Sequence, residues 1–195
     1  MKLGRLILRG TVGGLFFAHG TQKLFGWFGG HGLDGTAQFF EGIGMRPGRA
    51  NALAAAVAET GGGALMALGF AMPLAASAIT SVMLTAINRV HAKNGPWNTE
   101  GGYEYNLVMI AVAAGLAEVG PGSPSLDSAL GIDVHGPRWA LAALGTGALG
   151  ALGAHLYAES QPAAPVPAAA PQPQPAAQPE GTEQPDPTSQ ATTAS

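Results

Sequence analysis

The sequence predicts an all-α, polytopic membrane protein: a four-helix bundle, a fifth C-terminal helix and a disordered tail. Charged residues make up only 11% of the 195 residues, less than half the share of about 25% that is usual in soluble proteins. Hydrophobic residues make up 47% and gather in five long runs. Segment 161–195 holds nine of the 15 prolines and no Lys or Arg, which predicts a tail that does not fold.

The five apolar runs define the expected helices. A helix rises about 1.5 Å per residue, so about 20 residues cross a hydrocarbon layer of about 30 Å. The first two runs have this length. The last three are shorter and cross only with help from their flanks, so four and five spans both stay open. The runs are Leu6–Phe28, Ala50–Met72, Leu74–Val90, Tyr105–Val119 and Trp139–Tyr157.

Two alternatives to a retained membrane bundle fit the sequence less well. A soluble bundle with Ala-rich core helices needs charged outer faces, and these runs have none. Lys2, Arg5 and Arg9 resemble the basic start of a signal peptide, but no clean Ala-x-Ala cleavage site follows and further apolar runs come later. We therefore expect a multi-pass protein with three segments: a membrane bundle over 1–128, a loop and additional hydrophobic helix over 129–160, and the tail over 161–195.

Small residues predict close helix packing. Gly10, Gly14 and Ala18 share one face of the first run, and small side chains let helix backbones approach in lipid. The last run has a similar set, Gly147, Gly150, Ala151 and Ala154. Such faces also allow an oligomer.

Composition excludes several function classes. The body, residues 1–160, has nine basic and nine acidic residues, so it lacks the basic face of a nucleic-acid-binding protein. Without cysteine, the chain has no thiol nucleophile and no Cys-ligated metal. The glycines lie in apolar helices, outside the strand–turn–helix context of a flavin or nicotinamide fingerprint, so no cofactor is identifiable from the residues.

Two ionisable residues predict an intramembrane site. His19 lies nine residues before the end of the first run, and Glu59 lies nine residues after the start of the second. If consecutive helices alternate in direction, both lie about 13 Å below the same surface. An ionisable group at that depth costs several kcal/mol and marks a functional site or a structural ion pair.

Other polar residues are expected near the same level. Lys23 shares a helix face with His19, and Thr85, Asn88 and His91 share a face of the third run. Lys23 snorkelling to the interface and Arg89 as an ordinary helix-end cation are the simpler interpretations. A metal held by His19, Glu59 and His91 lacks any tight ligand spacing, so we predict none. The expected ligand-binding or proton-relay pocket comprises His19, Gln22, Lys23, Glu59, Thr85, Asn88, Arg89, His91 and Glu104.

Several phrases resemble the DoxX family of small bacterial membrane proteins, and they occur in the family's order from about Arg5 to Ser128. They are Leu15-Phe16-Phe17-Ala18-His19-Gly20, Lys23-Leu24-Phe25-Gly26, Glu59-Thr60-Gly61-Gly62-Gly63, Asn88-Arg89-Val90-His91, Gly101-Gly102-Tyr103-Glu104-Tyr105, Gly120-Pro121-Gly122 and Ser125-Leu126-Asp127. The resemblance implies a four-helix bundle in the bacterial cytoplasmic membrane. It also implies redox and stress-response roles, such as a membrane subunit of a thiosulfate:quinone oxidoreductase type or a partner of thiol-detoxifying enzymes.

Three functions remain open from the sequence. The first is a membrane redox component, such as a quinone-linked oxidoreductase subunit, that binds a quinone-like acceptor in the polar pocket and receives electrons from a soluble partner protein or a small reductant. The second is a non-catalytic scaffold for soluble detoxifying enzymes. The third is a small transporter, although no inverted repeat is visible. Pocket volume separates the first two, because a collapsed ion-pair network leaves no room for a ring.

Overall fold

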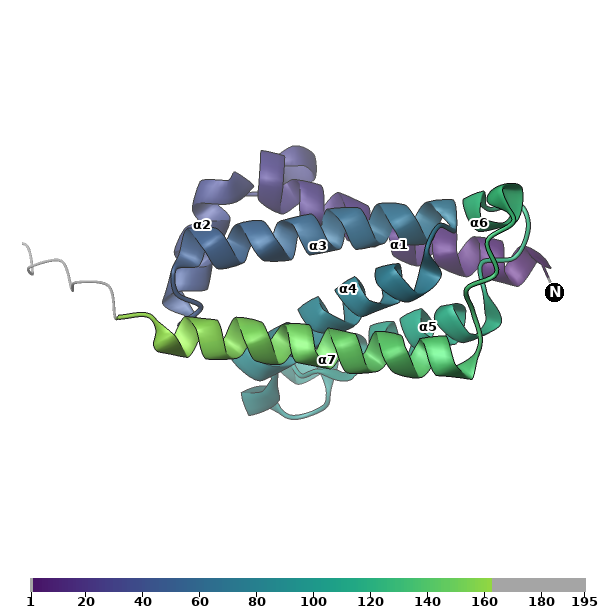
Figure 1. Cartoon of the computed structure of the whole chain (residues 1–195). Helices are drawn as coiled ribbons and strands as arrows, with labels where there is room; N and C mark the ends of the chain where they lie inside the picture. Colours follow the sequence, from purple (N-terminus) through teal and green to yellow (C-terminus); the bar gives the residue numbers. More distant parts are fainter. Residues whose placement is uncertain (1, 163–195) are drawn as a thin grey trace, which may run out of the picture. The chain divides into compact units, whose positions relative to one another are not determined.

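The long helices run in alternating directions, as short connections between apolar helices favour (Figure 1). A computed structural model describes residues 2–162, and this part of the chain is all-helical. The α-helices are α1 (Lys2–Phe25), α2 (Gly32–Gly42), α3 (Gly48–Leu68), α4 (Met72–Ala86), α5 (Glu104–Val119), α6 (Leu126–Leu130) and α7 (Pro137–Ser160). The single-turn 3₁₀ segments are η1 (Trp27–Gly29), η3 (Ala92–Asn94) and η4 (Asn98–Glu100), and η2 (Ile87–His91) is a π-helix that extends α4.

Glycines bring α1 and α3 into backbone contact. A Cβ atom added at Gly63 would lie 2.3 Å from the Phe17 amide nitrogen, and one at Gly13 would lie 2.4 Å from the Ala67 nitrogen. Gly10 and Gly14, the pair that the sequence suggested for packing, have nothing within 4 Å of such an atom. The α1–α3 interface therefore uses a neighbouring face of α1.

The other half of the bundle consists of α4, α5 and α7, which pack on one another. Gly147 of α7 faces Ser77 and Thr80 of α4, and Gly150 faces Ser81. The small residues predicted for the last run do pack against a neighbouring helix. The two halves are joined where α3 turns into α4, with Gly62 against Ala75 and Ala78.

A polar cluster holds the turn between α3 and α4. Arg9 of α1 is 3% exposed and donates to the carbonyl oxygens of Ala67, at 2.9 Å, and Pro124. Asp127 of α6, 1% exposed, accepts from the Ala71 amide at 3.0 Å. Because Ala71 has a left-handed backbone (φ 48°), which costs a residue with a Cβ atom free energy, this hydrogen bond stabilises a turn that is otherwise unfavourable.

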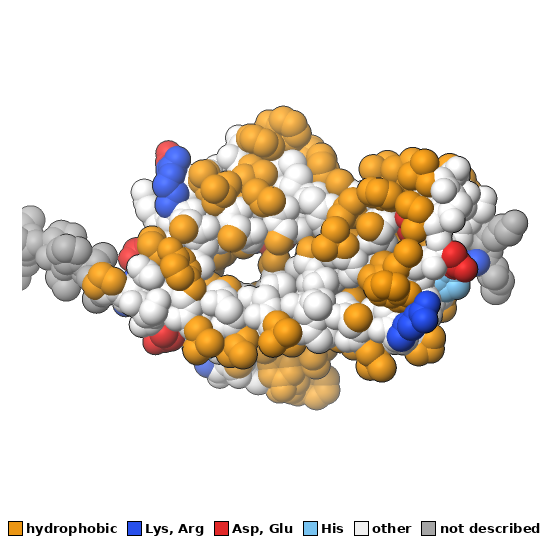
Figure 2. All heavy atoms as spheres, in the orientation of Figure 1, with side chains coloured by type: hydrophobic (Ala, Val, Ile, Leu, Met, Phe, Trp, Pro, Cys, Tyr) orange, Lys and Arg blue, Asp and Glu red, His pale blue; other side chains and the backbone are white. Residues whose placement is uncertain are grey.

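Large apolar side chains lie on the outside and small or polar ones inside. Alanine and glycine line much of the interior, whereas Leu and Phe side chains such as Leu15, Leu74 and Leu149 are more than half exposed. On the face in Figure 2, charged side chains lie toward the two ends and apolar ones between them. A soluble protein rarely exposes so continuous an apolar surface.

By length and composition, α7 is long and apolar enough to cross a membrane, and among the described residues it alone meets both conditions. The segment 29–49, between the first two apolar runs, was expected to be a loop, but it contains helix α2. The described residues 2–162 belong to one compact unit that includes α7. The predicted tail lies almost wholly outside the described residues, and the proposed division at residue 128 stays a prediction.

Candidate functional site

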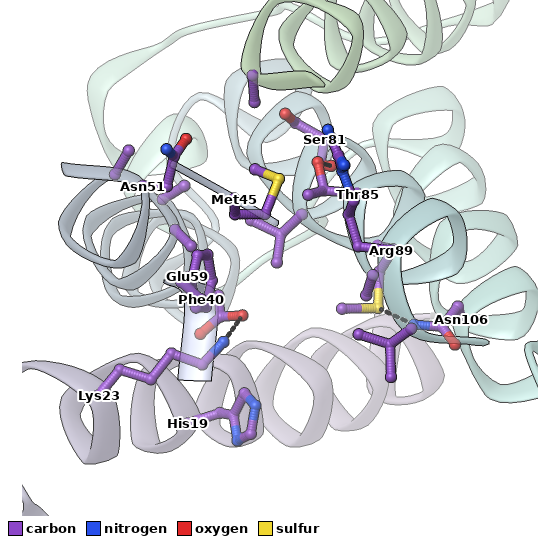
Figure 3. Close-up of a pocket in the computed structure, with 18 of the residues that line it drawn as sticks. His19, Lys23, Phe40, Met45, Asn51, Glu59, Ser81, Thr85, Arg89 and Asn106 are labelled. Carbon is purple, nitrogen blue, oxygen red and sulfur yellow. Dashed lines mark hydrogen bonds and ion pairs between the residues drawn. The ribbon is translucent and has the colours of Figure 1, made fainter. Parts of the chain in front are cut away.

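A cavity of about 560 Å³ lies between the two halves of the bundle (Figure 3). This volume is within the range of about 300–1,000 Å³ that is usual for small-molecule sites. Most lining side chains are apolar, and the polar ones come from five helical segments: α1, α3, α4, η2 and α5. The polar or ionisable lining residues are His19, Gln22, Lys23, Asn51, Glu59, Ser81, Thr85, Arg89, His91, Tyr105 and Asn106.

The Lys23–Glu59 ion pair is the most buried charged feature of the cavity. Lys23 Nζ of α1 donates to Glu59 Oε1 of α3 at 2.6 Å, and the two side chains are 18% and 0% exposed. Gly20, one turn before, permits this approach, because a Cβ atom there would lie 2.4 Å from the Thr60 nitrogen. Glu59 Oε2 has no hydrogen-bond partner among the described residues, so this buried carboxylate can accept a further hydrogen bond.

His19 lies one helical turn from Lys23, at a more exposed place on the cavity wall. Its Nδ1 atom lies 3.1 Å from Gln22 Oε1, and Gln22 Nε2 donates to the Phe28 carbonyl oxygen at 3.2 Å. The imidazole thus has its hydrogen bond with Gln22 and not with Glu59. It adds a second ionisable side chain of α1 to the cavity wall.

The π-helix η2 shapes the opposite wall. A π turn adds one residue to the helical repeat, and such turns are frequent at functional sites. Arg89 and His91 line the main cavity, and Asn88 lines a second pocket of about 230 Å³ between α4 and α7, which Thr85 and Arg89 line as well. Thr85 therefore lines both pockets, whereas Asn88 and His91, the last two members of the predicted face, line different ones.

Helix α7 holds the Arg89 guanidinium. Arg89 is 12% exposed; its Nη1 donates to Glu159 at 3.0 Å, and its Nη2 lies 2.7 Å from His155 Nδ1. His91 Nδ1 lies 2.8 Å from the Gly101 carbonyl oxygen. Contacts with α7 and with Gly101 thus fix the two ionisable side chains of this wall, Arg89 and His91.

Glu104 does not line the cavity. Its Oε1 atom accepts from the backbone amide of Asn98 at 2.9 Å, so it orders the loop before α5. Two cavity residues that sequence reasoning missed are Asn51 (6% exposed) and Asn106 (4% exposed). Each is an amide side chain among apolar residues near the start of an apolar run. This pattern in the sequence could have marked them as polar residues of the interior.

Helix α2 and the loop after it contribute to the cavity wall. Phe40 and Met45 are 7% and 1% exposed, and they pack with Ala52 of α3 and Ala158 of α7. Both also line the cavity. Among the described residues, no three His, Asp or Glu side chains converge as metal ligands do.

The family model of DoxX matches residues 4–92, from α1 through η2. A protein of Bacillus subtilis (strain 168) named "Putative oxidoreductase CatD" is 31% identical over 111 residues, which cover 57% of this chain and 76% of that protein. The chain belongs to the DoxX family. No solved structure matches it significantly. The family match includes eight of the nine residues of the predicted pocket, but it ends before Glu104 and before α7.

The family match therefore contains both partners of the Lys23–Glu59 pair. It also contains Arg89, but not the α7 residues that hold the guanidinium. In this DoxX protein, α7 completes the cavity with Gly150 and Ala154. The wall opposite α3 is thus formed partly by a segment beyond the matched region.

Proposed function

We propose that this DoxX protein is a multi-pass component of the bacterial cytoplasmic membrane that binds a quinone-like acceptor in its cavity and serves a redox system. The observation that carries the proposal is the buried Lys23–Glu59 pair beside a cavity of about 560 Å³. A purely structural ion pair has no need of such space. The printed name of the Bacillus subtilis relative, an oxidoreductase, agrees with a redox role.

The membrane placement is supported by the exterior of the bundle. Leucine and phenylalanine side chains point outward while Glu59, Asn51 and Asn106 point inward. In water this arrangement exposes apolar surface and buries polar groups, and both are unfavourable. In a bilayer it matches apolar surface to lipid and collects the polar groups at a protected site.

A quinone ring matches the polar groups of the cavity. It carries two carbonyl oxygens, which accept hydrogen bonds, on opposite sides of an apolar ring. The Lys23 ammonium has three N–H donors and uses one for Glu59, so others are available for one ring oxygen. On the opposite wall, Asn106 Nδ2 donates to the Met83 sulfur at 3.3 Å, and its second N–H is a donor for the other ring oxygen (Figure 3). Arg89 adds positive charge to this wall.

Reduction of the quinone to the quinol takes two electrons and two protons. Positive charge from Lys23 and Arg89 stabilises the negative charge that develops on the ring oxygens. Glu59 accepts and donates protons at the ring, and His19, which lines the same cavity, is a second group that can transfer protons. The chain has no cysteine, so we assign the electron donor to a separate redox protein or small reductant.

The test is binding of a short-chain benzoquinone to the purified, full-length protein in detergent. The wild type is compared with Glu59→Gln and His19→Ala. Glutamine keeps an oxygen that accepts from Lys23 but removes the carboxylate, so we expect Glu59→Gln to fold while its quinone affinity falls at least about tenfold, or about 1.4 kcal/mol. Glu118→Gln, an exposed position on α5, is the matched control.

Three results decide between the interpretations. Saturable binding that both cavity variants weaken, with a normal Glu118→Gln control, supports the quinone site. Absence of binding to the wild type contradicts it. Loss of protein level and binding in equal proportion in Glu59→Gln identifies the pair as structural and favours the scaffold.

A further inference from the structure

The cavity is open on the side between α3 and α7. Helix α3 belongs to the half of the bundle that contains α1, and α7 belongs to the half that contains α4 and α5. Among the described residues, α3 and α7 share no extended packing. They meet near α2, where Ala158 packs with Ala52 and Met45. At its other end, α3 packs on α4 instead. Figure 2 shows the surface hollowed between α3 and α7, which Figure 1 labels in the same orientation.

The rim of this opening is made of the smallest side chains. Ala54 and Ala58 lie one turn apart on α3, and Gly150 and Ala154 lie one turn apart on α7; all four line the cavity. Ala54 and Gly150 are exposed. Residues beside the rim are large and apolar, such as Val57, which is 54% exposed. The opening therefore faces an apolar exterior, and its four rim residues carry no charge.

A buried polar group lies directly behind this rim. Glu59 follows Ala58 in α3, is 0% exposed, and its Oε2 atom has no partner among the described residues. Figure 3 shows its carboxylate pointing into the cavity toward Lys23. The opening thus leads from an apolar surface to a polar site, as required for an amphipathic ligand with a polar head and an apolar chain.

The α2 region contributes a second, packed part of the cavity wall. Phe40 and Met45 line the cavity and pack with Ala52 and Ala158, and Glu41 and Arg46, the residues next to them in the chain, form an ion pair at 3.5 Å. A ligand that is soluble in lipid reaches the open side without crossing these groups.

We propose that the gap between α3 and α7 is a lateral portal for a long-chain quinone. The ring lies at the Lys23–Glu59 pair, and the isoprenoid chain passes between Ala58 and Gly150 into the acyl region of the bilayer. This inference rests on the proposed function and names its ligand class: a membrane-resident quinone instead of a water-soluble one.

The test compares two quinones with the same ring, one with a short chain and one with a long isoprenoid chain. Dissociation constants are measured for the full-length protein in lipid nanodiscs. Ala58→Phe narrows the portal, and Ala54→Phe does so at the exposed outer rim. Val57→Phe adds a phenyl group to the same helix at a position that does not line the cavity, so it is the matched control.

We expect Ala58→Phe and Ala54→Phe to weaken long-chain quinone binding at least about tenfold. Short-chain binding should stay within about twofold of the wild type, and Val57→Phe should bind both ligands normally. Thermal unfolding midpoints show that the variants fold. If Ala58→Phe does not fold, Ala54→Phe decides the outcome.

Equal weakening of both quinones overturns the portal, because it places the new side chain in the ring site. Unchanged long-chain binding in both rim variants overturns it as well. Short-chain binding by the wild type without long-chain binding overturns the portal and leaves the proposed function standing. If the wild type binds neither quinone, the proposed function fails, and this inference fails with it.

Discussion

The contact between α1 and α3 at Gly63 makes a sharp prediction about stability. A Cβ atom at this position would lie 2.3 Å from the Phe17 nitrogen and 2.6 Å from the Gly13 carbonyl oxygen. Ordinary van der Waals contact begins near 3.4 Å, so the Gly63→Ala protein must separate the two helices by about 1 Å. Both obstacles are backbone atoms, and no side-chain rotation can relieve the overlap.

The expected cost follows from this geometry. Overpacking a well-packed interface costs about 1–3 kcal/mol, and a backbone obstacle places Gly63→Ala at the upper end. Replacing glycine by alanine within a helix stabilises the helix by about 1 kcal/mol, because alanine has the higher helix propensity. The net loss is therefore about 2 kcal/mol. For a chain of this size, it corresponds to a fall of about 4–8 °C in the unfolding midpoint.

The assay is thermal unfolding of the purified protein in detergent, followed by circular dichroism. Gly61→Ala is the control, because Gly61 lies two residues earlier in α3 and a Cβ atom there meets nothing within 4 Å. Its midpoint should be unchanged or higher. If Gly63→Ala is as stable as the wild type, or if both variants lose the same stability, the close packing of α1 on α3 is refuted.

Two further variants test the buried polar groups. Asp127→Ala removes the acceptor of the Ala71 amide, so we expect a loss of about 1–3 kcal/mol in unfolding free energy; Asp127→Asn keeps an oxygen acceptor and should lose less, and equal losses would contradict this role. Lys23→Met leaves the fully buried Glu59 carboxylate without its partner, which costs about 3–5 kcal/mol. Adding Glu59→Gln should recover part of that stability in a double-mutant cycle, and strictly additive losses would show that the pair is not coupled.

The positions of His19 and Glu59 illustrate what sequence arithmetic can do. The helical rise is the same for every sequence, so counting from the ends of two apolar runs placed these residues at one depth. The structure has both lining one cavity. It also pairs Glu59 with Lys23, whereas the sequence left open whether Lys23 snorkels to the interface. Depth is a one-dimensional property, but pairing also depends on how each helix is rotated.

Asn88 shows where periodicity fails. A regular α-helix would place it on one face with Thr85 and His91. Thr85 lines both pockets, but Asn88 and His91 line different ones. The π turn at Ile87–His91 adds a residue to the helical repeat, and a pattern that assumes uniform helix geometry does not reveal it.

Helix α2 was missed for a related reason. It has 11 residues with three glycines, and a short, Gly-containing helix is marginal by itself. Phe40 gains its stabilisation from Met45 and from residues of α3 and α7. Such a helix forms because distant segments bury one of its faces.

By itself, the sequence determined the helical class and the long helices, because apolar runs and charge scarcity are local properties that act through the transfer free energy of each residue. It also determined the family, through phrases such as Glu59-Thr60-Gly61 that stand in a fixed order. The tertiary structure alone decided the partners: which glycine faces a backbone, which cation meets Glu59, and that α3 and α7 leave an opening. These depend on the relative rotation and separation of helices far apart in the chain, which are set by summed packing over whole interfaces.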